Sequence, residues 1–295
     1  MKKENKRSVD LVVISDLHLG TYGCRADELL NYLRSIKPKV LVLNGDIIDM
    51  WQFSKHYFPS SHMKVIKYIT SLLAKGTTVH YITGNHDEML RKFAGYQLGG
   101  LHIANKLVLE LDGLRTWFFH GDVFDVTMRH SRWLAKLGGK GYDSLIVLNA
   151  MVNRASKAFG GGRFSFSKRI KNGVKGALKH ISDFEGTAAR FASDAGYRIV
   201  VCGHIHQPAL RVINVGQEEP VVYMNSGDWV ENMTALEFTG NTWSLYSYLE
   251  DKDLHARLYG AQDEEGIELE KVTSTRDVLF EDLLKEFSAP KFNAV

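Results

Sequence analysis

The segment Thr83-Gly84-Asn85-His86-Asp87-Glu88 follows directly on the apolar run Val79–Ile82. The run is typical of a buried strand, and Gly84 permits a sharp turn at its end. Polar side chains such as Asn85 and His86 at a buried strand end need hydrogen-bond partners or a charged ligand. Taken alone, the motif is explained as well by an ordinary strand-to-helix turn with an N-terminal cap. The other strand ends of the chain therefore decide between the two interpretations.

Two earlier segments repeat this arrangement. The strand expected over Asp10–Ser15 runs into Asp16-Leu17-His18, and the strand expected over Val40–Leu43 runs into Gly45-Asp46-Ile47-Ile48-Asp49. Residues i and i+2 of an extended chain point to the same side, so the Asp and His of the first motif would face one ligand. The spacing of leucines and isoleucines predicts helices between the strands, over Ala26–Ile36 and Met63–Leu73. The alternation predicts a largely parallel sheet.

The second half of the chain has the same kind of strand end twice more. Thr116–Phe119 is followed by His120, and Ile199–Cys202 is followed by Gly203-His204-Ile205-His206. Between them we expect a basic helical insert over 123–180, and beyond 250 an acidic extension, 251–295. Further elements expected are the helices Phe184–Ala195 and Val278–Phe287 and the strands Leu107–Leu111, Leu210–Val215, Val221–Asn225, Thr234–Phe238 and Thr242–Leu249.

Composition is that of a globular protein. Of 295 residues, 44% are hydrophobic and 24% are charged, so a large buried core is expected. The net charge of +3 is too small to indicate nucleic acid as a partner. Cys24 and Cys202 are too far apart for a zinc ribbon or a disulfide framework. No apolar run approaches the about 20 residues that cross a bilayer, and we expect a cytoplasmic protein.

The polar residues at these strand ends form a typical metal-binding set. Ligands of open α/β sheets collect beyond the carboxyl ends of the strands. Carboxylate, imidazole and amide groups without thiolate suit Mn, Fe or Zn, and there are too many for one four-coordinate site. Two divalent cations about 4 Å apart, sharing a carboxylate, would clamp a displacement at phosphorus. The candidate ligands are Asp16, His18, Asp46, Asn85, His120, His204 and His206.

These motifs, D-x-H, G-D-x-x-D, G-N-H-[DE], H and G-H-x-H, stand in the order that resembles the calcineurin-like metallophosphoesterases. The resemblance implies an α/β fold, the αββα four-layer sandwich, with Asp46 bridging two metals. Asp16, His18 and His206 would complete one site, and Asn85, His120 and His204 the other. It also implies that His86 donates a hydrogen bond or proton to the leaving oxygen. The G-D-x-x-D spacing proposes Asp49 as the carboxylate that orients His86, with Asp87 as the less favoured partner.

A narrower resemblance is to the UDP-2,3-diacylglucosamine pyrophosphatase branch of that superfamily. It rests on Ser15–Gly20, Gly45–Trp51, His120–Asp122 and Asn225–Glu231, and on the insert, which in that branch caps the site and shelters acyl chains. It implies hydrolysis of a nucleotide-linked lipid, with manganese as the first choice of metal. His86 departs from the branch, whose best-known enzymes carry Arg there.

The basic insert can be interpreted either as a substrate-binding region or as a solvated surface with no role in binding. Its cations and interleaved aromatic residues suit an anionic, partly apolar substrate, and peripheral contact with the inner membrane face. A solvated basic cap with an ordinary hydrophobic underside explains the same composition equally well. Alternative functions are a phosphoesterase acting on another nucleotide, a phosphoprotein or nucleic acid, and a non-catalytic scaffold. The residues expected to bind substrate are Arg129, Arg132, Lys168, Arg169 and Lys171.

Overall fold

The computed structural model describes residues 6–52, 57–126, 166–216 and 219–259, and the side chains of helix α4 (Phe166–Asp194) from residue 179 onwards. The chain divides into two compact units, 1–249 and 250–295. The described part of the second unit contains a short helix, α5 (Lys252–Tyr259). Among the described helices, none combines the length and the apolar character that a membrane crossing requires.

The larger unit contains two sheets, and the first is a seven-stranded mixed sheet. Its order is β12-β11-β1-β2-β3-β5-β4, with β1, β2, β3 and β5 parallel to one another. The middle strands are buried on both faces, which is why they read as unbroken apolar runs in the sequence. The strands are β1 (Arg7–Ile14), β2 (Ile36–Asn44), β3 (Thr78–Ile82), β4 (Gln97–Leu98), β5 (Leu101–Ala104), β11 (Thr234–Thr239) and β12 (Thr242–Ser247).

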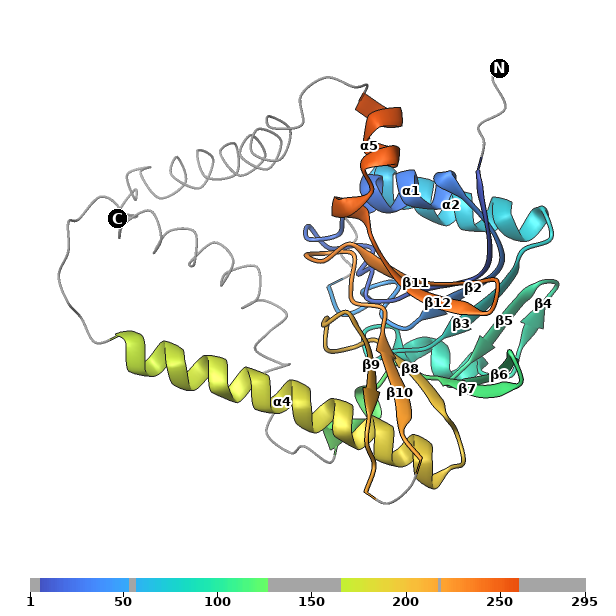
Figure 1. Cartoon of the computed structure of the whole chain (residues 1–295). Coiled ribbons are helices and arrows are strands. Elements are labelled where there is room, and N and C mark those ends of the chain that lie inside the picture. The colour runs from blue at the N-terminus through green and yellow to red at the C-terminus, as the bar shows by residue number, and fades with distance from the viewer. Residues whose placement is uncertain (1–5, 53–56, 127–165, 217–218, 260–295) are drawn as a thin grey trace, which may run out of the picture. The chain divides into compact units, whose positions relative to one another are not determined.

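Two helices, α1 (Ala26–Ser35) and α2 (Ser60–Ala74), lie side by side on one face of this sheet (Figure 1). Helix α1 buries one face, including Leu29 and Leu33, against the sheet. Its first turn carries Asp27 and Glu28 and its last turn Arg34, the charge arrangement that the helix dipole favours. These helices form the first outer layer.

A second sheet has five strands in the order β6-β7-β8-β10-β9. Helix α4 covers its outer face, where Phe184, Ala188 and Ala192 pack with Val200 and Tyr223 (Figure 1). The small alanines let the helix approach the sheet closely. The strands are β6 (Leu107–Leu111), β7 (Leu114–Phe118), β8 (Ile199–Cys202), β9 (Ala209–Ile213) and β10 (Val221–Asn225).

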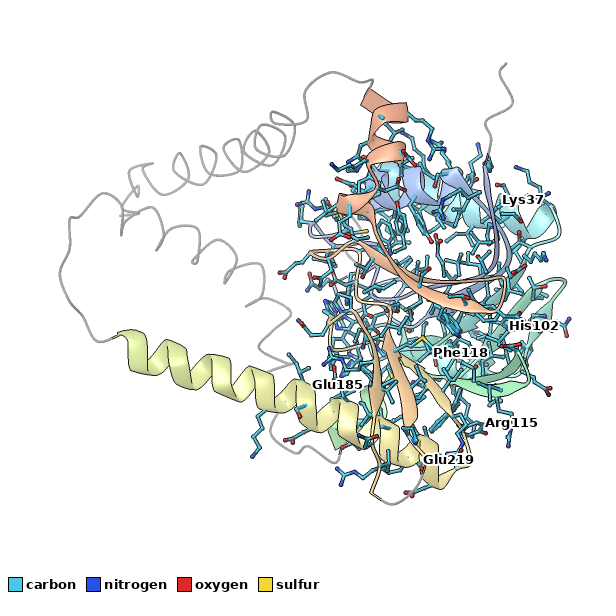
Figure 2. All side chains as sticks on the ribbon, in the orientation of Figure 1. Lys37, His102, Arg115, Phe118, Glu185 and Glu219 are labelled. Carbon is cyan, nitrogen blue, oxygen red and sulfur yellow. The ribbon has the colours of Figure 1, made fainter. Side chains whose placement is uncertain are left out.

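The main core lies between the two sheets. Leu11, Val42 and Ile82 from the first sheet pack against Phe118 and Met224 from the second. Phe118, labelled in Figure 2, is completely buried there. Helix, sheet, sheet and helix therefore form four layers, and the predicted αββα sandwich is confirmed.

Some elements differ from those predicted. The short strands β4 and β5 and the 3-10 helix η1 (Glu88–Phe93) were not expected. Helix α4 is one continuous helix from Phe166, although the sequence predicted a helical insert up to about His180 and a separate helix from Phe184. The first part of the predicted cap, apart from η2 (Asp122–Val126), and most of the acidic extension, including the helix expected over Val278–Phe287, lie outside the described residues. The proposed domain limits therefore stay predictions.

Candidate metal centre

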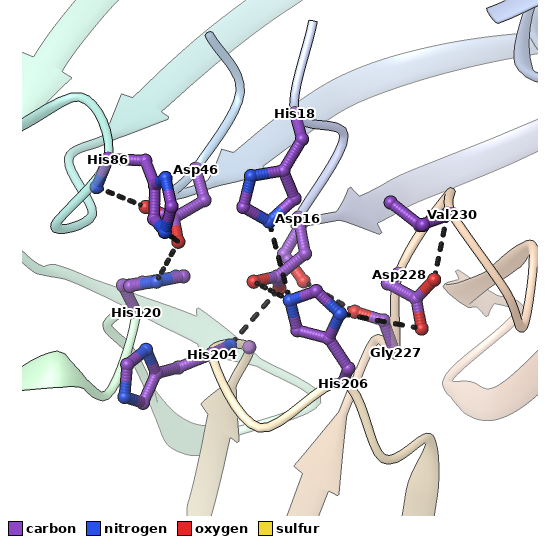
Figure 3. A network of polar contacts seen from close by, with 12 residues as sticks. Asp16, His18, Asp46, His86, His120, His204, His206, Gly227, Asp228 and Val230 are labelled. Atoms are coloured by element: carbon purple, nitrogen blue, oxygen red, sulfur yellow. Dashed lines mark hydrogen bonds and ion pairs between the residues drawn. The ribbon is translucent and has the colours of Figure 1, made fainter. Parts of the chain in front are cut away.

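All the predicted metal ligands lie just beyond the C-terminal ends of strands. The structure brings six of them together (Figure 3): Asp16, His18, Asp46, His120, His204 and His206. Parallel strands of both sheets end at this edge, as expected for the ligand-binding side of an α/β fold. The ends of β1, β2 and β3 supply Asp16, His18, Asp46 and Asn85, and the ends of β7 and β8 supply His120, His204 and His206.

The first cluster consists of Asp16, His18 and His206, whose potential ligand atoms all lie within 4.8 Å of one another. His206 Nε2 lies 3.2 Å from Asp16 Oδ1 and 3.3 Å from His18 Nε2. Asp16 is fully buried, and its other oxygen accepts a hydrogen bond from the His204 backbone N–H at 3.1 Å. One carboxylate and two imidazoles thus converge on a single point.

The second cluster consists of Asp46, His120 and His204, again with ligand atoms within 4.8 Å of one another. His120 Nε2 lies 3.2 Å from Asp46 Oδ2, and His120 Nδ1 donates to the Asn44 carbonyl oxygen at 2.9 Å. That donation leaves Nε2 as the nitrogen free to bind a metal. A third group, His18, Asp46 and His86, joins the two clusters, because it shares His18 with the first and Asp46 with the second.

The donor atoms fit two divalent cations. Asn85 Oδ1 is buried and accepts no hydrogen bond within the described structure, which is costly for an amide oxygen unless a ligand satisfies it. The donors are oxygen and imidazole nitrogen, as Mn, Fe or Zn would accept. The residues present therefore suit the pair of divalent cations that the family motifs imply.

The acidic and basic side chains of the site shift one another's pKa values. Burial alone would raise the pKa of Asp46, but His120 and His18 nearby hold that pKa well below its ordinary value. Burial opposes ionisation of Asp16 as well, and His206 outweighs it, so the pKa of Asp16 is lowered. Both carboxylates are therefore ionised and ready to bind cations at neutral pH.

The backbone at these positions is strained. Asp16, His18, Asp46, His204 and His206 all have positive φ angles, of 53°, 49°, 55°, 70° and 53°. Non-glycine residues in this region cost roughly 1–3 kcal/mol each and persist where the surroundings fix them. Here the loops fix one another, for example through the His18 N–H, which donates to the Asp46 carbonyl at 3.0 Å. Such strain is concentrated at functional sites.

The glycines of the motifs make room for the carboxylates. A Cβ at Gly203 would lie 2.6 Å from Asp16 Oδ2, and a Cβ at Gly84 would overlap Asp46 Oδ1. A side chain at either position would push a carboxylate out of the cluster. This is the physical reason for glycine before N-H-[DE] and before H-x-H.

His86 lies beside the clusters and is held by Asp49. His86 Nδ1 is 2.8 Å from Asp49 Oδ2, which also lies 3.2 Å from His18 Nδ1. Burial would lower the pKa of His86, but the hydrogen bond that His86 donates to Asp49 and the charge of Asp46 raise it overall. The same two histidines, His86 and His18, outweigh burial and lower the pKa of Asp49.

Asp87, the less favoured candidate partner of His86, has other bonds. Its Oδ2 accepts from the Tyr81 hydroxyl at 2.7 Å and from the Ile47 N–H at 3.0 Å, and its Oδ1 accepts from the Gly84 N–H at 2.5 Å. Asp87 thus fixes the turn that carries Asn85 and leaves Asp49 as the carboxylate at His86.

The structure adds two residues to which the sequence assigned no role. The Trp51 ring lies against that of His86 at a centroid distance of 4.2 Å and an interplanar angle of 34°, and Trp51 is 48% exposed. Asp228 is fully buried, with Oδ2 at 4.0 Å from His206 Nδ1. Their only signal in the sequence is membership of the longer family motifs, Gly45–Trp51 and Asn225–Glu231.

The residues predicted to bind substrate cannot be placed at this site. Arg129 and Arg132 lie outside the described residues. Lys168, Arg169 and Lys171 belong to the backbone of α4, but their side chains lie outside the described part. Their role stays a prediction.

The comparisons with known proteins agree with this geometry. The family model for calcineurin-like phosphoesterases matches residues 9–208. Among curated relatives, the UDP-2,3-diacylglucosamine hydrolase of Nitrosococcus oceani is 25% identical, over 77% of this chain and 90% of its own length. That of Ralstonia nicotianae is 27% identical, over 67% of this chain and 77% of its own length. The solved phosphoesterase Yfce from E. coli aligns at 14% identity with a TM-score of 0.40, covering 81% of this chain and 92% of Yfce.

The family match covers well over half of the 295 residues and spans every strand end that contributes to the two clusters. It begins within β1 and ends just beyond His206. The residues inside it are also those whose donor atoms fit divalent cations. The chain therefore belongs to the calcineurin-like phosphoesterase family and is a metal-dependent phosphoesterase.

Proposed function

We propose that this phosphoesterase hydrolyses the pyrophosphate bond of a nucleotide-linked lipid of the UDP-2,3-diacylglucosamine type. One observation carries the phosphoester chemistry: two Asp/His clusters, linked through His18 and Asp46, lie beside a histidine held by its own carboxylate. The substrate class rests on the branch motifs and on the curated hydrolases with which this chain shares 22–27% identity.

The assignment of ligands follows the clusters. One cation is assigned to Asp16, His18 and His206, and the other to Asp46, His120 and His204. The family resemblance adds Asp46 to the first cation as a bridging ligand and Asn85 to the second. Manganese is the first choice, with iron or zinc as alternatives of the same ligand preference. When bound, the pair supplies a water of lowered pKa and positive charge for the phosphoryl oxygens.

His86 is assigned the proton transfer. With Nδ1 hydrogen-bonded to Asp49, His86 presents Nε2 towards the clusters, 4.0 Å from Asp46 Oδ2. As water adds to phosphorus and the bond to the leaving oxygen breaks, protonated Nε2 donates its proton to that oxygen. The raised pKa of His86 favours the protonated form that this step needs. Asp49 fixes the ring and its tautomer.

The basic insert is proposed to hold the anionic and apolar parts of the substrate and to bring the protein to the inner membrane face. This part of the proposal rests on composition alone. The residues proposed for it are Arg129, Arg132, Lys168, Arg169 and Lys171.

The test compares three substrates with the manganese-loaded protein: UDP-2,3-diacylglucosamine, a simple nucleotide diphosphate and an aryl phosphodiester. We expect the first to have the highest kcat/KM. Asp46→Asn should abolish hydrolysis of all three, and His86→Ala should lower kcat by about 10²–10⁴-fold because it removes the general acid. Equal turnover by His86→Ala would remove its assigned role.

The dependence of activity on salt concentration and on acyl-chain length distinguishes a nucleotide-lipid substrate from the alternative substrates. A nucleotide or nucleic-acid substrate held by the insert's cations should lose affinity steeply as salt rises. A nucleotide-lipid should respond instead to detergent and to the length of its acyl chains. Preference for a simple nucleotide would exclude the lipid while leaving the phosphoesterase chemistry intact, and full metal binding without any hydrolysis would favour the scaffold alternative.

A further inference from the structure

The loop 226–233, which joins β10 to β11, touches the backbones of two predicted metal ligands from different sheets. The Trp229 N–H donates to the Asp16 carbonyl at 3.2 Å. The Asn232 side-chain amide donates to the His206 carbonyl at 2.9 Å. The loop therefore connects the ends of β1 and β8 at the first cluster.

Asp228 is the centre of this loop and is fully buried (Figure 3). Its Oδ1 accepts hydrogen bonds from the backbone N–H groups of Val230, Glu231 and Asn232 at 2.8, 2.6 and 3.3 Å. Its Oδ2 accepts from the Asn232 side-chain amide and lies 4.0 Å from His206 Nδ1. One oxygen thus shapes the loop, and the other faces a predicted metal ligand.

The His206 ring consequently lies between two buried carboxylates. Asp16 faces its Nε2 at 3.2 Å, and Asp228 faces its Nδ1. A histidine that binds a metal through Nε2 must carry its proton on Nδ1, and a carboxylate on that side favours this tautomer. At 4.0 Å the interaction is electrostatic rather than a hydrogen bond. Asn232 supplies the direct link, since its amide bridges Asp228 Oδ2 and the His206 carbonyl.

We infer that Asp228 and Asn232 are a positioning pair that orients His206 and fixes its tautomer for binding through Nε2. The inference rests on the proposed metal site and adds two residues that are not among its predicted ligands. It specifies one cation, that of the first cluster, because the contacts of the pair to predicted ligands are with His206. The second cluster has its own support, the Asn44 carbonyl at His120.

A purely structural role in capping the loop is the competing explanation, and Asp228→Asn separates the two. Asparagine retains an oxygen for the backbone N–H groups of the loop. Its NH₂ group would then face the Asn232 amide and the Nδ1 side of His206. In the parent, the carboxylate oxygen at this place accepts a hydrogen bond from Asn232 and attracts the Nδ1 proton of His206. The loop should stay folded while the support of His206 is lost.

The experiment titrates the full chain with Co²⁺ and follows both stoichiometry and the visible absorption spectrum. The parent should bind two equivalents. In Asp228→Asn, affinity for one equivalent should fall about 10–100-fold with a changed spectrum, while the other equivalent binds as in the parent. Asn232→Ala should weaken the same equivalent. Glu110→Gln, which removes one exposed carboxylate from β6, is the matched control and should bind as the parent.

Two outcomes overturn the inference. Asp228→Asn could bind both equivalents with the parent's affinity and spectrum, or it could lose both together with a drop in melting temperature, which would assign Asp228 to loop folding alone. A parent protein that binds no metal would instead refute the proposed function.

Discussion

At the scale of single residues, His206 shows how a neighbouring carboxylate shifts the pKa of a predicted metal ligand. Burial would lower its pKa, but the adjacent Asp16 carboxylate raises the pKa of His206 to about 9. The ring is therefore protonated at neutral pH and forms an ion pair with Asp16. A metal needs the neutral imidazole, so binding must displace a proton.

This predicts a pH-dependent metal affinity. Below about pH 9, affinity for the first-cluster cation should rise about tenfold per pH unit for each proton displaced, and it should level off above that pH. Release of at least one proton per protein at pH 7 should be measurable by titration calorimetry in two buffers of different ionisation enthalpy. Identical heats in both buffers would show that His206 is already neutral.

The sequence predicted the acids and histidines that cluster in the structure because each stands within a few residues of the end of an apolar run. It could not predict Asp228 or Asn232 as partners of His206, since they follow β10, more than twenty residues along the chain. Their contacts depend on the course of a loop, and the sequence pattern does not determine that course. Trp51 was missed for the same reason: its contact with the His86 ring depends on the three-dimensional path of two loops.

At the scale of elements, prediction succeeded where burial is continuous. The bounds of β8 and β10 were predicted to the residue, because both are buried runs that end at a polar motif. The hairpin of β4 and β5 was missed, since its residues are exposed or half-buried and its strands are short. The continuous helix α4 was only partly predicted because glycines and basic residues interrupt its apolar pattern before Phe184.

Strands β3 and β5 carry a histidine pair that predicts acid sensitivity. His80 and His102 are register partners, and their rings stack at a centroid distance of 4.9 Å. Burial and the neighbouring His102 lower the pKa of His80 to about 4 from its ordinary 6.5. The unfolded chain takes up a proton here before the folded one does. Because the unfolded chain is protonated first, the free energy of unfolding decreases as the pH falls from 6.5 towards 4. Above pH 6.5 His80 is neutral in both states, and the free energy of unfolding no longer depends on its protonation.

His80→Gln should flatten the dependence of the free energy of unfolding on pH between 6.5 and 4. A fully linked proton gives about 1.4 kcal/mol per pH unit, and half-buried His80 should account for only part of this. Urea denaturation at several pH values measures the slope, with His180→Gln on α4 as the control. Equal slopes in parent and His80→Gln would contradict the assignment.

At the scale of the whole larger unit, the site is where the two sheets meet. Asp16, His18, Asp46 and Asn85 come from the seven-stranded sheet, and His120, His204 and His206 come from the five-stranded one. In the ligand assignment proposed above, each cation takes ligands from both sheets. Bound metal would therefore connect the two halves of the sandwich in addition to serving catalysis.

It follows that metal removal should destabilise the fold. A ligand at 100 times its Kd stabilises the folded state by about 2.7 kcal/mol, and a unit of this size gains roughly 2–4 °C in Tm per kcal/mol. We expect chelation to lower Tm by about 5–10 °C for each cation lost, measured by calorimetry with and without EDTA. Asp46→Asn replaces the carboxylate that is proposed to bind both cations, so the Tm of this variant should change little when EDTA is added. A parent Tm that stays constant while bound metal is stripped would show that the cations do not join the sheets.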